Sequence, residues 1–225
     1  MLKRGIPLFL LLIFHFSVLN GQGIITADGY MELVSNYFGS MRDYEANITI
    51  RTGGTEMVGR VSYLSPNFLR IDFSRPAEQV INFNGEALTV YVPDMRAVLS
   101  QTLTPSRRGA PGSGSGGLTL LRRNYVASFV TGPNPEPLDP GSSERVVKLR
   151  LTRRTTAEGF REIIVSINPD TRTIRRMEGR TIGDGEVVFN FTNIRINQGI
   201  PEQRFLYDPP PSANMYNNFL FRLND

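Results

Sequence analysis

Short runs in which apolar and polar residues alternate, separated by turn residues, make up most of this chain. In the run YLSPNFLRIDFSRP, Leu69, Ile71 and Phe73 alternate with Arg70 and Asp72. Successive side chains of a β-strand point to opposite faces of the sheet, so this run is typical of a strand with one apolar face. That face must be kept from water, either by a filled core or by a cavity that holds an apolar guest.

The same alternation predicts strands over much of the chain, with close turns between them. The expected strands are 44–51, 56–64, 68–73, 79–83, 87–92, 96–100, 144–154, 161–167, 173–180 and 185–192. The Asn84-Gly85 pair between two of these runs is a strong hairpin signal. Because parallel strands need long crossover connections, the short links favour an antiparallel sheet.

Two segments have the spacing of amphipathic helices. The first, TADGYMELVSNYFGSMRDYEA, has an apolar stripe, and Thr26 or Asp28 can cap its start. In the second, LTLLRRNYVASFV, one stripe contains Leu118, Leu121 and Tyr125. These helices are the available lid for a sheet that is not closed.

The remaining segments complete the expected organisation. Residues 101–117 are rich in Gly, Ser and Pro, which predicts a flexible loop. A short amphipathic helix is expected around 215–221, after a triple proline. The sequence thus predicts a mainly β, α+β fold in one domain over residues 23–225.

Residues 1–22 have the layout of a secretory signal peptide. Basic Lys3 and Arg4 precede an apolar run, Ile6–Leu19, and small and polar residues follow it. The run is shorter than the ~20 residues that span a bilayer as a helix. We expect cleavage near Gly21 or Gly23, the alternative being an uncleaved membrane tether.

The composition excludes several kinds of catalysis. His15, the one histidine, lies in the apolar run, and the chain has no cysteine. A mature chain without His and Cys lacks the residues for Ser-His-Asp or Cys-His catalysis and the commonest zinc ligands. The carboxylates are scattered near turns, which does not suggest the facing pair of a glycosidase. We therefore expect no enzyme activity, no metal and no cofactor.

The charge is modest, although the chain is basic. Loss of Lys3 and Arg4 would lower the net charge from +4 to +2, and Lys148 would be the one remaining lysine. The paired arginines are compatible with a solvated surface or with contact to anionic lipid or an acidic partner. Nucleic-acid binding is not expected, because no strongly basic domain or basic motif with interleaved aromatic residues is present.

The order of these segments resembles the periplasmic outer-membrane lipoprotein carriers, the LolA family, whose relatives include LolB and RseB-like proteins. The likeness lies in the first helix leading into NITI, in GRVSYLSPNFLRIDFSRP, and in QVINFNGEALTVYVPDMRAV with its Asn-Gly turn. It continues in GGLTLLRRNYVASF at the second helix and in FLYDPPPSA near the end. Together these stretches cover most of residues 24–215.

The resemblance implies an unclosed antiparallel half-barrel of about 11 strands, with helices covering its concave apolar face. It implies a periplasmic monomer that binds the acyl chains of lipoproteins and carries them from the inner to the outer membrane. An inner-membrane release complex and an outer-membrane acceptor would be its partners. The alternative is a periplasmic lipid-binding sensor or interaction protein of the same fold that regulates a partner.

By position, the resemblance assigns ligand-binding residues to the cavity and to the lid. These are Leu69, Ile71, Phe73, Ile81, Phe83, Leu118, Leu121 and Tyr125. One position departs from the family pattern. Ser65 stands before Pro66-Asn67, where the best-known carriers have a basic residue that ties the lid shut. We therefore expect lid closure to work differently in this chain.

Overall fold

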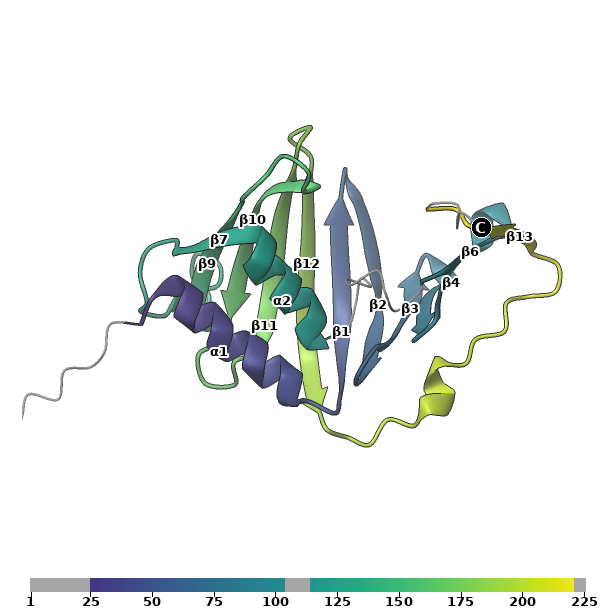
Figure 1. Cartoon of the computed structure of the whole chain (residues 1–225), viewed down its shortest axis with the longest axis horizontal. Coiled ribbons are helices and arrows are strands. Elements are labelled where there is room, and N and C mark those ends of the chain that lie inside the picture. The colour runs from purple at the N-terminus through teal and green to yellow at the C-terminus, as the bar shows by residue number, and fades with distance from the viewer. Residues whose placement is uncertain (1–24, 104–113, 221–225) are drawn as a thin grey trace, which may run out of the picture.

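One large sheet whose two edges do not meet forms the frame of the protein (Figure 1). The computed structural model describes residues 25–103 and 114–220. Within them, the strands are β1 Asp43–Thr52, β2 Thr55–Leu64, β3 Phe68–Arg75, β4 Ala77–Asn84, β5 Ala87–Val92, β6 Ala97–Thr102, β7 Tyr125–Phe129, β8 Glu136–Pro137, β9 Arg145–Arg153, β10 Phe160–Ile167, β11 Ile174–Thr181, β12 Glu186–Ile196 and β13 Asn214–Asn217. The helices are α1 Ala27–Ser40 and α2 Gly114–Asn124, with short 3-10 turns η1 Pro93–Met95 and η2 Glu202–Phe205.

The strand order is β13-β6-β5-β4-β3-β2-β1-β12-β11-β10-β9-β7, and β8 pairs with β9 outside this path. Only the pairing of β13 with β6 is parallel among the described strands. Pairing of β1 with β12 joins the N-terminal and C-terminal halves of the chain in the middle of the sheet. The expected unclosed antiparallel sheet is confirmed, with thirteen strands instead of about 11 because short β8 and β13 join it.

The two helices lie across the half of the sheet formed by β7 and β9–β12 (Figure 1). As expected, Thr26 caps α1, and its Oγ1 accepts a hydrogen bond from the Gly29 N–H at 3.1 Å. Met31 and Val34 of α1 are buried against the sheet. Arg122 of α2 is 3.1 Å from the Glu32 carboxylate of α1, so an ion pair links the helices. The expected lid of helices is therefore present.

The second helix differs from the prediction at both ends. It begins at Gly114, inside the predicted loop 101–117, and it ends at Asn124. Residues 125–129 form β7, which pairs with β9, instead of continuing the helix. Tyr125 and Phe129 fit a helical stripe, but Tyr125, Ala127 and Phe129 also alternate as in a strand. The free edge of β9 decides in favour of the strand. Of the predicted loop, residues 104–113 lie outside the described residues.

The predicted helix near residue 215 is wrong over the described residues. Asn214–Asn217 form β13 and extend along β6. The edge of β6 offers unpaired backbone groups, and a short exposed segment gains more hydrogen bonds there than in an isolated turn of helix. Residues 1–22, the predicted signal peptide, lie outside the described residues, so that assignment stays a prediction.

Candidate apolar binding cavity

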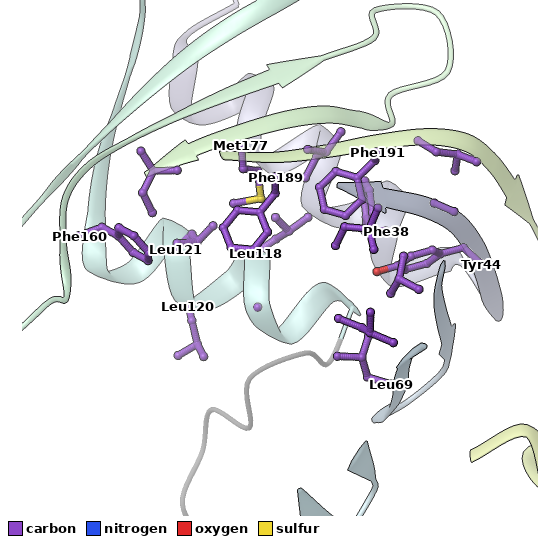
Figure 2. Close-up of a pocket in the computed structure, with 18 of the residues that line it drawn as sticks. Phe38, Tyr44, Leu69, Leu118, Leu120, Leu121, Phe160, Met177, Phe189 and Phe191 are labelled. Carbon is purple, nitrogen blue, oxygen red and sulfur yellow. The ribbon is translucent and has the colours of Figure 1, made fainter. Parts of the chain in front are cut away.

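A cavity of about 590 Å³ lies between the inner face of the sheet and the helices (Figure 2). This size falls in the range of ~300–1,000 Å³ that is common for small-molecule sites. The lining residues are Phe38, Met41, Tyr44, Ala46, Ile48, Val61, Leu69, Ile71, Gly117, Leu118, Leu120, Leu121, Asn124, Tyr125, Glu158, Phe160, Ile163, Ile174, Met177, Phe189, Phe191 and Ile194. Apart from tyrosine hydroxyls, the only polar side chains in this lining belong to Asn124 and Glu158.

The pairing of β1 with β12 brings the largest share of the lining together. Ile48 lies opposite Phe191, and Ile50 lies opposite Phe189. Directly opposed residues of antiparallel strands share a face, so the aromatic rings of β12 and the aliphatic side chains of β1 point the same way. Leu118 and Leu121 of α2 face them from across the cavity (Figure 2).

Phe160 and Tyr44 lie at opposite ends of the row of lining side chains in Figure 2. The Phe160 ring packs on Gly179 of β11, where an added Cβ would lie 2.7 Å from the ring. The Tyr125 hydroxyl donates a hydrogen bond to the Phe160 carbonyl at 3.2 Å. Burial, and then the charge of Glu158, raises the pKa of Tyr125. The Phe160 end of the cavity is therefore held in place by both packing and a hydrogen bond.

The Tyr44 end is built from stacked aromatic rings. The Tyr44 ring stacks on Tyr63 with centroids 5.2 Å apart and meets the edge of Phe38 at 6.1 Å. Burial raises the pKa of the Tyr44 hydroxyl, with a smaller contribution from Tyr63. The hydroxyl therefore stays protonated at neutral pH. Its oxygen points toward the interior of the cavity (Figure 2).

The structure brings five of the eight predicted site residues to this cavity and leaves three outside it. Leu69, Ile71, Leu118, Leu121 and Tyr125 line it, although Tyr125 does so from a strand rather than from the lid helix.

The other three predicted residues, Phe73, Ile81 and Phe83, are not among the lining residues. Phe73 belongs to a core cluster with Ala46, Ile48, Ile50 and Val61, and Ile81 packs against that cluster. Phe83 is 2% exposed and is one of the largest fully buried side chains. That cluster shares Ala46, Ile48 and Val61 with the cavity lining, so the core that holds Phe73 borders the cavity. That the five lining residues bind a ligand stays a prediction.

Sequence reasoning missed most of the wall contributed by the C-terminal half. Phe160, Met177, Phe189 and Phe191 line the cavity from β10, β11 and β12. The alternation of 185–192 marks Phe189 and Phe191 as one face of a strand. It does not reveal that this strand pairs with β1, because that contact joins residues far apart in the chain.

The opposite face of β3 is covered by the C-terminal tail. Phe205 is fully buried, and its ring lies 5.5 Å from that of Phe68. The Arg70 guanidinium donates to the carbonyls of Arg204 and Leu206 at 3.2 and 3.0 Å.

An ion pair and a cation–π contact complete this covering. Asp72 pairs with both Arg70 and Arg204. The Arg70 guanidinium lies 5.3 Å from the centre of the Tyr207 ring. Arg70 thus fastens the tail and does not reach the cavity, in agreement with its place in the alternation.

Ser65, the position that departs from the family pattern, lies away from the cavity lining. Its backbone N–H donates to the Arg42 carbonyl at 2.7 Å. The ion pairs that join the two helices are made by Arg122 of α2. Its guanidinium lies 3.1 Å from the Glu32 carboxylate and 3.7 Å from the Asp28 carboxylate of α1.

Within residues 25–103 and 114–220, no three His, Cys, Asp or Glu residues gather as metal ligands would. No described helix is both long enough and apolar enough to cross a membrane.

Comparisons with known proteins agree with this architecture. The chain is 22% identical over 177 residues to the outer-membrane lipoprotein carrier protein of Pseudomonas aeruginosa, covering 76% of this chain and 77% of the relative. Among solved structures, an uncharacterised conserved protein from Thermus thermophilus matches with a TM-score of 0.56 at 12% identity, over 85% of this chain and 98% of its own. A chain in the MucA/MucB complex of Pseudomonas aeruginosa matches with a TM-score of 0.53 at 12% identity, over 84% of this chain and 62% of its own. No protein-family profile matches.

The structural matches establish the fold, and the carrier match extends the likeness to sequence over three quarters of the chain. An open sheet with helices over an apolar cavity is the architecture that the sequence resemblance implied. The sequence resemblance to the outer-membrane lipoprotein carriers is therefore confirmed, at 22% identity over three quarters of the chain.

Proposed function

We propose that this protein binds the acyl chains of lipidated proteins in its apolar cavity and carries them through an aqueous compartment. The observation that carries the proposal is the cavity of about 590 Å³, whose lining is almost entirely apolar. A guest of matching chemistry is needed to keep such a surface from water. The similarity to an outer-membrane lipoprotein carrier supports acyl chains as that guest.

Burial of hydrocarbon supplies the driving force for this activity. Transfer of each acyl methylene from water to an apolar site contributes ~0.8 kcal/mol. Binding and release then need no bond to be made or broken, so we propose that the protein is not an enzyme and uses no cofactor. Handover to an acceptor requires only that the acceptor bind the acyl chains more favourably.

The predicted signal peptide at residues 1–22 supports the periplasm as the compartment. The proposed route runs from an inner-membrane release complex to an outer-membrane acceptor, with the protein acting as a monomer. The cargo is an acylated lipoprotein.

A second function is favoured by the match to a chain in the MucA/MucB complex. In this alternative, the protein binds a lipid in the same cavity and thereby regulates a protein partner. Both functions use the cavity, but a carrier gives its guest to an acceptor, whereas a sensor keeps a partner bound or releases it.

Native mass spectrometry with lipid extraction on the purified protein tests whether the cavity holds acyl chains. A Leu121→Glu variant should bind a fluorescent analogue of palmitate at least tenfold more weakly, because it places a carboxylate in an apolar wall. Leu206→Glu is the matched control, since Leu206 is 69% exposed on the tail and lies outside the cavity lining.

A protein that carries no lipid when purified and takes up no probe would contradict the proposal. Equal probe binding by wild type and Leu121→Glu would place the probe somewhere other than the cavity. Recovery of a stable protein partner, released when acyl chains are added, would favour the sensor.

A further inference from the structure

The Tyr44 hydroxyl is an exception within the apolar lining of the cavity. It belongs to β1, and Phe38 and Leu69 are among the lining residues near it (Figure 2). The ring is fixed between Tyr63 and Phe38. The stack on Tyr63 and the edge contact with Phe38 restrict the χ1 rotation that would turn the hydroxyl away from the cavity.

Other tyrosines near the cavity have internal partners for their hydroxyls. Tyr63 donates to the Pro66 carbonyl at 3.1 Å, and Tyr125 donates to the Phe160 carbonyl at 3.2 Å. Among the described residues, the Tyr44 hydroxyl has no hydrogen-bond partner. Tyr44 is half-buried and its hydroxyl faces the cavity, so this hydroxyl is open to a polar group of whatever fills that cavity.

The missing partner must come from whatever fills the cavity. An apolar guest displaces water from the hydroxyl, and a guest without a polar atom would leave that group desolvated and without a hydrogen bond. Because the hydroxyl stays protonated, it is available as a donor, and the matching group is a hydrogen-bond acceptor. Ester, amide and carboxylate oxygens are the acceptors found at the end of an acyl chain.

We propose that Tyr44 donates a hydrogen bond to the carbonyl oxygen of a bound acyl chain, and so selects acyl groups over plain hydrocarbon. This inference rests on the proposed binding of acyl chains and names the group that is recognised. It also orients the guest. The carbonyl lies at the Tyr44 end, and the hydrocarbon tail runs past Leu118 and Leu121 toward Phe160 (Figure 2).

The polar side chains at the other end of the cavity do not suit this role equally. The Glu158 carboxylate only accepts hydrogen bonds when ionised, so it cannot donate to a carbonyl. Asn124 can donate through its amide nitrogen, while its amide oxygen accepts from the Arg123 guanidinium at 3.3 Å. Asn124 is therefore the competing donor that an experiment must separate from Tyr44.

The test uses two fluorescent pyrene probes of equal chain length, one ending in a methyl ester and the other in a plain alkyl group. Wild-type protein should bind the ester probe about 3- to 10-fold more tightly, as one net hydrogen bond predicts. Tyr44→Phe should bind both probes equally while keeping its affinity for the alkyl probe. Tyr63→Phe is the matched control, because it removes a neighbouring hydroxyl that points to Pro66, and it should keep the preference.

Each other outcome overturns a defined part of the proposal. Wild-type protein that binds both probes equally contradicts selection of the carbonyl but leaves acyl binding intact. A Tyr44→Phe variant that keeps the ester preference contradicts the role of Tyr44, as does loss of the preference in Asn124→Leu alone. If neither probe binds to wild type, the proposed function fails, and this inference fails with it.

Discussion

Both faces of β3 are covered, but they carry different side chains and are covered in different ways. On the inner face, Leu69 and Ile71 look into the cavity beneath the helices. On the outer face, Phe68 packs against the fully buried Phe205 of the tail. One strand can therefore have an apolar face toward open space and a mixed face against packed chain, where Arg70 and Asp72 hold the tail beside Phe68.

The difference between these covers lies in how they are fastened. The tail is held to β3 and β4 by directed bonds, including those from Arg70 and a hydrogen bond from the Asn82 amide to the Phe205 carbonyl at 2.9 Å. The helices over the cavity contact each other and β7, at the far edge of the sheet. The tail is bonded directly to β3 and β4, and it packs there as core. The helices are held by their contacts with each other and with β7, and a cavity remains between them and β3.

The largest expected effect comes from removing the anchor of the tail. Phe205→Ala should lower the free energy of unfolding by ~3–5 kcal/mol, as large-to-small changes of buried aromatic residues do. Denaturant unfolding measures this loss, and Leu206→Ala is the control. Leu206 is 69% exposed, so its change should stay within ~0.5 kcal/mol. Acyl binding by the folded fraction should be unchanged, and a selective loss of binding would mean that the tail shapes the cavity.

A smaller effect is expected on the cavity side. In Gly179→Ala, the new methyl group would meet the Phe160 ring and push it toward the cavity. Overpacking of this kind costs ~1–3 kcal/mol of unfolding free energy. Titration with acyl probes of increasing length should show weaker binding of the longest ones. Gly183→Ala is the control, because nothing lies within 4 Å of its added Cβ. Unchanged length preference would mean that Phe160 does not limit the guest.

The smallest effect is a pH dependence of the tail attachment. Burial raises the pKa of Asp72, but hydrogen bonds and charges from Arg70 and Arg204 outweigh it, so the pKa lies below its ordinary value of 3.8. Because the pKa of Asp72 is lower in the folded state, its carboxylate stabilises the folded protein at pH values above the unfolded-state pKa. This stabilisation is lost as the pH falls through the folded-state pKa of Asp72.

Denaturant unfolding between about pH 5 and pH 3 tests this pH dependence. Asp72→Asn should lose less stability than wild type over that interval, because it has no carboxylate to protonate. Equal pH dependence of the two proteins would mean that the ion pairs of Asp72 do not hold the tail.

Several features follow from local sequence and could be predicted from it. Period-two alternation predicted the principal strands, since adjacent side chains on a strand must face opposite ways. Thr26 was a predicted cap of α1, and Asn84-Gly85 was a predicted turn. In that turn, the Asn84 side chain accepts from the Ala87 N–H at 2.8 Å, and Gly85 has a φ of 91°. Each of these features depends on residues a few positions apart.

Only the tertiary structure decided which apolar residues line the cavity. Leu69 and Phe73 have the same place in the alternation, yet Leu69 lines open space and Phe73 fills a core cluster. Tyr125 fits a helical stripe and a strand equally well, and the edge of β9 selected the strand. The sequence by itself determined which faces are apolar, because that depends on residue type and backbone period. What covers each face depends on contacts between distant segments, which no local pattern records.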